Sequence, residues 1–204
     1  MRTETIKIYR FNELSEKAQR YAWENATDYG DDYCLDFQHI LGKFEDAFGI
    51  KVYRYSVGDI YKPTFAFTMD SLATEAPKGD PLRLARYIWN NYADLIMRGK
   101  RYSSRMKIVN GDFHYVSRKS QAIKSLDDCA LTGICWDADL LQPIIDCLHY
   151  KRFFNDIDEL FTASLTAFFD AWQADIEYCR SFEYYGEKAE FNDFEYMEDG
   201  SRWA

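Results

Sequence analysis

Four side chains in the second half of the chain are of the types that bind zinc: Cys129, Cys135, Cys147 and His149. Structural zinc sites usually hold their ligands in short pairs, with about two to four residues between the members of a pair. Here five, eleven and one residues separate successive candidates. The spacing therefore favours buried, unreactive cysteines over a metal site, and we expect no cofactor.

A Cys–His pair could also act in nucleophilic catalysis. The nearest such pair in the sequence, Cys34 and His39, lies on one expected helix, where five positions amount to about 140° of rotation. The two side chains are therefore not neighbours. The sequence also lacks a Gly-rich phosphate loop, a Gly-x-Ser-x-Gly turn and a His-Glu-x-x-His helix. We expect no catalytic residues and a binding protein, while an enzyme whose site assembles from distant residues remains an alternative.

Basic residues are concentrated between Arg98 and Lys124, where eight Lys and Arg stand against the single acid Asp112. Such a segment could contact phosphates or an acidic protein, although a solvated sheet face explains it equally well. We refer to its candidate contact residues as the basic hairpin: Arg101, Arg105, Lys107, His114, Arg118 and Lys119.

The hairpin itself is predicted from Asn110-Gly111, which separates two strand-like runs. Both residues tolerate positive φ, as a two-residue type I′ turn requires, and this turn fixes the register of the strands. One side of the ladder is expected to carry the pairs Ile108–Phe113, Met106–Tyr115 and Ser104–Ser117, and the other Lys107–His114, Arg105–Val116 and Ser103–Arg118. We expect the first, more apolar side to meet helices.

The end of the chain has the opposite charge. From Asp170 onward it has ten acidic residues and three basic ones, interleaved with aromatic residues, and we expect this end to contribute little to the core. Carboxylates held on an ordered scaffold can mimic the phosphates of DNA, whereas a plain acidic helix face is the alternative. The candidate partner-binding residues are Glu183, Glu187, Glu190, Asp193 and Glu195.

The composition limits the classes of protein that this chain can belong to. With 204 residues, 47% of them hydrophobic and 18% aromatic, it can bury a substantial core. An isoelectric point near 4.9 argues against binding of nucleic acid by the molecule as a whole. Five cysteines without close pairing, and no signal peptide, indicate a reduced, cytosolic protein. No apolar run is long enough to cross a membrane, so we expect no membrane partner.

The hydrophobic periodicity predicts an α+β fold, an antiparallel β-sheet packed against several amphipathic helices. We expect a single domain over 1–204, with a long C-terminal helix and the acidic end from about 156. Asp137 or Asp139 is expected to cap a helix, Gly186 to end one, and Trp89, Phe168 and Trp172 to be mostly buried. The expected strands are 3–9, 50–57, 64–69 and 191–196. The expected helices are one that starts at about 16 and is ended by Gly30, and those over 32–47, 81–97, 140–150 and 156–184.

Five segments together resemble, in order, a family of small uncharacterised bacteriophage and prophage accessory proteins. They are FNELSEKAQRYAWEN, YRYSVGD, LTGICWDADLLQPI, AWQADIEYCRSFEYY and FEYMEDGSRW. The resemblance implies a virus-encoded protein that acts in a bacterial cell, and it supplies no catalytic residues.

Our leading hypothesis is a stoichiometric inhibitor of a host defence complex that handles nucleic acid, of the anti-CRISPR or anti-restriction type. Its partner would be a host protein or ribonucleoprotein complex, bound through the acidic end as a DNA mimic. The alternative is an accessory protein that binds nucleic acid directly through the basic hairpin. The sequence predicts no oligomeric state.

Overall fold

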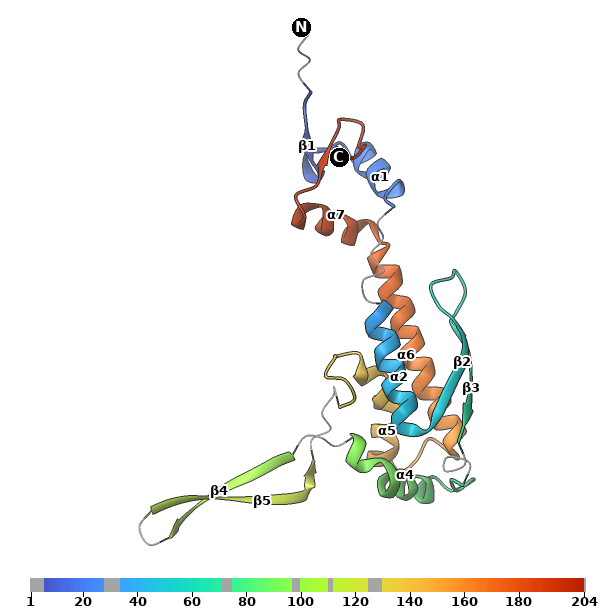
Figure 1. Cartoon of the computed structure of the whole chain (residues 1–204), viewed down its shortest axis with the longest axis vertical. Helices are drawn as coiled ribbons and strands as arrows, with labels where there is room; N and C mark the ends of the chain where they lie inside the picture. The colour runs from blue at the N-terminus through green and yellow to red at the C-terminus, as the bar shows by residue number, and fades with distance from the viewer. Residues whose placement is uncertain are drawn as a thin grey trace. The chain divides into compact units, whose positions relative to one another are not determined.

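The computed structural model describes residues 6–27, 34–70, 75–96, 100–109, 112–124 and 130–203. For residues 34, 93, 94, 96, 100–109 and 112–124 the description covers the backbone alone. Contacts within the chain group into two compact units (Figure 1). Unit 1 consists of the described parts of 1–33 and 173–204, and unit 2 of the described parts of 34–172. Whether the two form the single expected domain stays a prediction.

The α+β class is confirmed. Helices alternate with strands that pair antiparallel in three separate ladders of two strands, β1 with β6, β2 with β3 and β4 with β5. The two hairpin ladders, β2–β3 and β4–β5, belong to unit 2, whereas β1 and β6 join the two ends of the chain in unit 1. Sequence-adjacent strands thus form hairpins, as the sequence predicts, and one further pairing is long-range.

Unit 1 is built from both ends of the chain. The first end supplies β1 (Tyr9–Arg10), the 3-10 turn η1 (Phe11–Glu13) and helix α1 (Glu16–Glu24). The second supplies the last residues of α6 (Ile157–Cys179), helix α7 (Phe182–Phe191) and β6 (Glu195–Tyr196). Tyr9 pairs with Tyr196 across the β1–β6 ladder. The Ser15 hydroxyl accepts the Ala18 amide proton at 3.3 Å, which confirms the expected start of α1.

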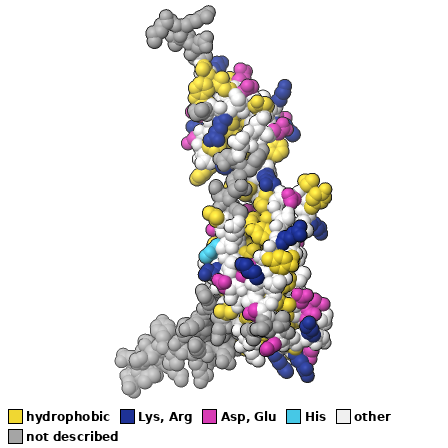
Figure 2. Space-filling view, turned by 45° about the vertical axis from the view of Figure 1, so that its right-hand side comes forward, with side chains coloured by type: hydrophobic (Ala, Val, Ile, Leu, Met, Phe, Trp, Pro, Cys, Tyr) yellow, Lys and Arg dark blue, Asp and Glu magenta, His cyan; other side chains and the backbone are white. Residues whose placement is uncertain are grey.

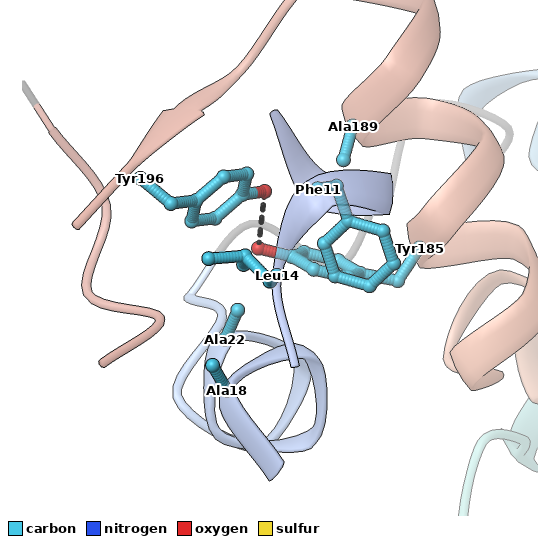
Figure 3. Close-up of a cluster of buried hydrophobic side chains, with 7 residues drawn as sticks. All are labelled: Phe11, Leu14, Ala18, Ala22, Tyr185, Ala189 and Tyr196. Atoms are coloured by element: carbon cyan, nitrogen blue, oxygen red, sulfur yellow. Dashed lines mark hydrogen bonds between the residues drawn. The ribbon is translucent and has the colours of Figure 1, made fainter. Parts of the chain in front are cut away.

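One compact core fills unit 1 (Figure 3), and both ends contribute to it. The Phe11 ring packs edge-on against Tyr185, with the ring centroids 5.5 Å apart. The hydroxyl groups of Tyr185 and Tyr196 meet at 3.0 Å inside the core. The expectation that the acidic end adds little to the core is therefore wrong. The buried members are Phe11, Leu14, Ala18, Ala22, Tyr185, Ala189 and Tyr196.

Unit 2 begins with helix α2 (Cys34–Phe48) and the hairpin of β2 (Ile50–Ser56) and β3 (Thr64–Met69). Helix α4 (Pro81–Ile96), strands β4 (Lys100–Val109) and β5 (Asp112–Lys124), helix α5 (Asp137–Tyr150) and most of α6 follow. Aromatic rings dominate its core. Phe37 stacks on Trp136 at 4.4 Å and on Trp172 at 5.0 Å between ring centroids.

Helix α4 starts as the sequence predicts. The Asp80 carboxylate accepts the amide protons of Leu82 and Arg83 at 3.0 and 3.1 Å, and Pro81 occupies the first turn. Phe168 and Trp172 on α6 are buried, as expected, but the prediction for Trp89 is wrong because 39% of this residue is exposed. Position 89 lies about 90° around α4 from the centre of the buried stripe, so the ring reaches only its margin. That stripe consists of Leu84, Ala85, Ile88 and Tyr92.

Other element boundaries differ from the predictions. Residues 6–8 form no strand, and residues 3–5 lie outside the described part of the chain. The long C-terminal helix stops at Cys179, because the Ser181 hydroxyl accepts the Tyr184 amide proton at 3.1 Å and starts a new helix there. Gly186 therefore lies within α7 and does not end a helix, and the strand expected from 191 is limited to β6.

Asp137 is the first residue of α5 and not its N-cap, a position that Trp136 occupies, and Asp139 follows in the first turn. The Asp137 carboxylate is buried and holds the preceding loop in place. It accepts the amide protons of Leu131 and Thr132 at 2.8 and 2.6 Å, and the Thr132 hydroxyl proton at 2.8 Å. The segment LTGICWD thus has a structural role, since one carboxylate orders the loop ahead of a helix.

Strands β4 and β5 pair antiparallel in the register that the sequence predicts. The Cα partners include Ile108 with Phe113, Lys107 with His114, Met106 with Tyr115, Arg105 with Val116, Ser104 with Ser117 and Ser103 with Arg118. Asn110 and Gly111 lie outside the described residues, and so do all side chains of the two strands. The expected contact between the apolar side and helices stays a prediction.

Candidate functional site

The acidic surface, which we define as Glu183, Glu187, Glu190, Asp193 and Glu195, belongs entirely to unit 1, and all five residues are exposed. Three of them occur on α7 at positions i, i+4 and i+7, which share one face of a helix. Tyr185 and Ala189, on the opposite side of α7, are buried in the unit 1 core. The core therefore anchors the helix and orients its carboxylates toward solvent.

Two members of the acidic surface have described partners. Asp193 forms an ion pair with Arg10, and its hydrogen bond to the guanidinium raises the pKa of Arg10. The Tyr178 hydroxyl donates to Glu187 at 3.3 Å, and the charge of that carboxylate raises the pKa of Tyr178.

The spacing of the α7 carboxylates can be compared with that of phosphates. With a rise of about 1.5 Å per residue, Glu183 and Glu187 are about 6 Å apart along the helix axis, and Glu187 and Glu190 about 4.5 Å. One strand of DNA carries a charge about every 3.4 Å along its axis. The linear charge density of this row is therefore about two thirds of that of one DNA strand.

The net charge is distributed very unevenly between the units. Residues 1–33 and 173–204 contain sixteen acidic and eight basic residues, a net charge of −8, whereas residues 34–172 contain eighteen and seventeen, a net charge of −1. Both kinds of charged side chain occur on the face seen in Figure 2. Unit 1 thus carries nearly all of the excess negative charge of the chain.

Only some of the basic hairpin residues belong to the same face of the β4–β5 ladder. Because residues alternate between the two faces of a ladder, the register assigns Arg105, Lys107, His114 and Arg118 to one face. Lys119 pairs with Tyr102 and belongs to the other face, and Arg101 lies at an irregularity between Lys100 and Tyr102. Four of the six candidate residues therefore share a face.

The candidate metal ligands do not converge among the described residues, where no group of three or more His, Cys, Asp or Glu could hold a metal ion. Cys135 is exposed in the loop before α5 and His149 is exposed near the end of α5. Cys147 is buried, and this burial raises the pKa of its thiol to about 11. Cys129 lies outside the described residues. For the Cys34–His39 pair, His39 is exposed and the Cys34 side chain is not described.

An exposed cluster of aromatic and basic side chains at the end of α5 was not predicted from the sequence. The Arg152 guanidinium lies 4.8 Å from the Phe153 ring centroid and 5.5 Å from that of Tyr150. Lys151 and Phe153 both have positive φ, 53° and 85°, which is unusual outside glycine. The run of aromatic and basic residues from His149 to Phe153 was the available signal.

No protein-family model, curated protein or solved structure matches this chain. The resemblance to phage accessory proteins therefore stays an expectation. Among the described helices, none has the length and apolar character needed to cross a membrane.

Proposed function

We propose that this chain is a phage-encoded accessory protein that inhibits a host defence complex by binding it stoichiometrically. The acidic surface would occupy a basic groove that otherwise holds nucleic acid. The observation that carries the proposal is the row of Glu183, Glu187 and Glu190 on α7, exposed to solvent and anchored from behind by Tyr185 and Ala189.

Two physical arguments support this role. Charges fixed on an anchored helix lose little conformational freedom on binding, so less of the interaction free energy is spent on ordering them. The net charge of −8 in unit 1 also attracts a basic groove over a distance of about 10 Å at moderate ionic strength. Association should therefore be fast and should slow as salt is added.

The first experiment identifies the partner by affinity capture with the full chain from bacterial cells, followed by mass spectrometry. The purified partner is then titrated with the parent and with a variant carrying Glu183→Gln, Glu187→Gln, Glu190→Gln and Glu195→Gln. We expect the variant to bind at least about tenfold more weakly, as loss of several charge contacts implies. Its thermal midpoint should change by only a few degrees, since exposed charges contribute little to folding.

A matched control neutralises four exposed carboxylates of unit 2: Asp46, Glu75, Asp158 and Asp170. This variant has the same change in net charge, so it separates a local contact from a general electrostatic effect. Binding should stay near that of the parent. Equal loss of affinity in both variants, or no loss in the folded Glu variant, would contradict the acidic surface as the site of inhibition.

A second candidate function is direct binding of nucleic acid by the basic hairpin. The register favours it, because Arg105, Lys107, His114 and Arg118 share one face of the β4–β5 ladder. Charge reversal of Arg105, Lys107 and Arg118 should then abolish binding to DNA or RNA, and the affinity of the parent should fall steeply with salt. The matched control reverses Lys62, Lys78 and Arg86, which are exposed in the same unit. A parent that binds no nucleic acid at low salt would exclude this function.

A further inference from the structure

A cavity of about 210 Å³ lies within unit 1, between α1 and the segment around β6. Tyr21 lines it from α1 and Asn25 from the C-cap of that helix, and the C-terminal segment contributes Tyr185, Phe194, Tyr196 and Arg202. This volume is smaller than the roughly 300 to 1,000 Å³ of pockets for drug-sized ligands, and it far exceeds the space for one water molecule. The cavity fits a small organic molecule with a single ring.

The hydroxyl pair in its wall has one hydrogen bond too few. Tyr185 and Tyr196 hydroxyls meet at 3.0 Å (Figure 3), and this contact uses one of their two protons. No described residue accepts the other proton. Tyr196 is fully buried, and a buried donor without an acceptor is costly. Since both tyrosines line the cavity, an acceptor atom bound there would complete the pair.

Arg202 supplies a positive charge to the wall of the cavity. Among the described residues that line the cavity, Arg202 alone is charged, in a unit whose net charge is strongly negative. Its guanidinium carbon lies 3.6 Å from the centroid of the Phe194 ring, so the group packs against that ring. No described carboxylate forms an ion pair with it. A guanidinium that packs against an aromatic ring and has no described carboxylate partner is suited to binding the carboxylate of a ligand.

We propose that this cavity binds a small aromatic monocarboxylate. Arg202 would pair with the carboxylate, the free proton of the tyrosine pair would be donated to the ligand, and the rings of Tyr21 and Phe194 would contact its flat body. The ligand would contact both ends of the chain at once, so its binding would stabilise unit 1. This inference does not depend on the inhibitory function proposed above.

The test titrates the full ¹⁵N-labelled chain with benzoate and, as a neutral molecule of nearly the same shape, benzamide, by NMR. A ligand of this size binds with a Kd on the order of 1 mM. We expect shifts confined to residues around the cavity, including Asn25 and Ser201. Benzamide should bind at least about fivefold more weakly, as loss of a charged partner implies.

Three single variants complete the experiment. Arg202→Gln should weaken benzoate binding to the level of benzamide, and Arg20→Gln, which removes an exposed charge from α1 outside the cavity, should leave it unchanged. A third variant, Tyr196→Phe, keeps the ring and removes one hydroxyl, and it should also weaken benzoate binding if it folds. The proposal is overturned if benzoate causes no localised chemical-shift changes at about 10 mM. That result would mean that the cavity holds only water. Equal binding of benzoate and benzamide would overturn it as well.

Discussion

Gly200 lies directly against the backbone of Ala18. A Cβ atom at position 200 would approach the Ala18 carbonyl carbon to 2.9 Å and its Cα to 3.1 Å, and Gly200 has a φ of +91°. The two residues come from opposite ends of the chain, and their contact requires glycine for both its conformation and its lack of a side chain.

Gly200→Ala should therefore destabilise unit 1 by about 2 kcal/mol or more, because it combines backbone strain with a clash against main-chain atoms. The control is Gly133→Ala, where φ is +90° but no atom lies within 4 Å of the added Cβ. Denaturant unfolding should give a clearly smaller loss for this control, about 1 kcal/mol. Equal losses would mean that the contact with Ala18 contributes nothing.

Truncation of Phe168 tests the aromatic core of unit 2. This ring is fully buried on α6 and packs against Phe37 at 5.6 Å between ring centroids. Phe168→Ala should lower the free energy of unfolding by about 3 to 5 kcal/mol, measured by urea titration. The half-exposed Trp89 is the comparison, and Trp89→Ala should cost only roughly 1 to 2 kcal/mol. A larger loss at Trp89 would contradict the orientation of α4.

Replacement of Asp137 by Ala should cost about 3 kcal/mol or more. The change leaves the amide groups of Leu131 and Thr132 without their acceptor in a partly buried loop. Asp146→Ala serves as the control, since Asp146 lies on the same helix and accepts one exposed hydrogen bond, from Gln142. Hydrogen exchange of the 131–134 amides should rise in the first variant alone.

The cysteines should differ in reactivity. At pH 8 the buried Cys147, whose pKa is raised to about 11, exists almost entirely as the thiol, and burial also blocks reagents. Iodoacetamide should modify the exposed Cys135 before the buried Cys147, as peptide mass spectrometry can measure. Rapid modification of Cys147 in the folded protein would contradict its place in the core.

The raised pKa of the Cys147 thiol also determines how the stability of the protein changes with pH. An unfolded Cys147 ionises near pH 9, while the folded one keeps its proton up to about pH 11. Unfolding then releases a proton, so the contribution of this residue to stability is complete below pH 9 and is lost between about pH 9 and 11. In the Cys147→Ala variant, the free energy of unfolding should decline less between about pH 9 and 11 than it does in the parent. This comparison of slopes holds even if the substitution changes the stability at pH 7.

Features that depend on neighbours in sequence were predictable. Asp80-Pro81 marks the start of α4, and the register predicted from Asn110-Gly111 is the one observed for β4 and β5, because capping and turn signals are local. The break between α6 and α7 has a local cause as well, in Ser181. It was missed because the apolar pattern continues across it, and such a pattern does not distinguish one long helix from two.

Features that depend on distant residues were not predictable. Arg10 and Asp193 are 183 positions apart, and nothing in the pattern around either residue indicates their ion pair. The acidic residues were found from their charge alone, whereas the core that anchors α7 and the cavity beside Arg202 exist only once the two ends meet. A single sequence carries no direct signal of such contacts.

The discontinuous construction of unit 1 has a consequence during synthesis of the chain. Phe11 and Leu14 leave the ribosome early, but the residues that cover them, Tyr185 and Tyr196, follow only after all of unit 2. At about 5 to 20 residues per second this delay is roughly 10 to 40 s. Unit 2 can fold on the nascent chain in that interval, whereas the first segment must wait with its apolar side chains uncovered. The acidic surface thus matures last, and ribosome-bound chains offer chaperones a binding site at residues 11–22.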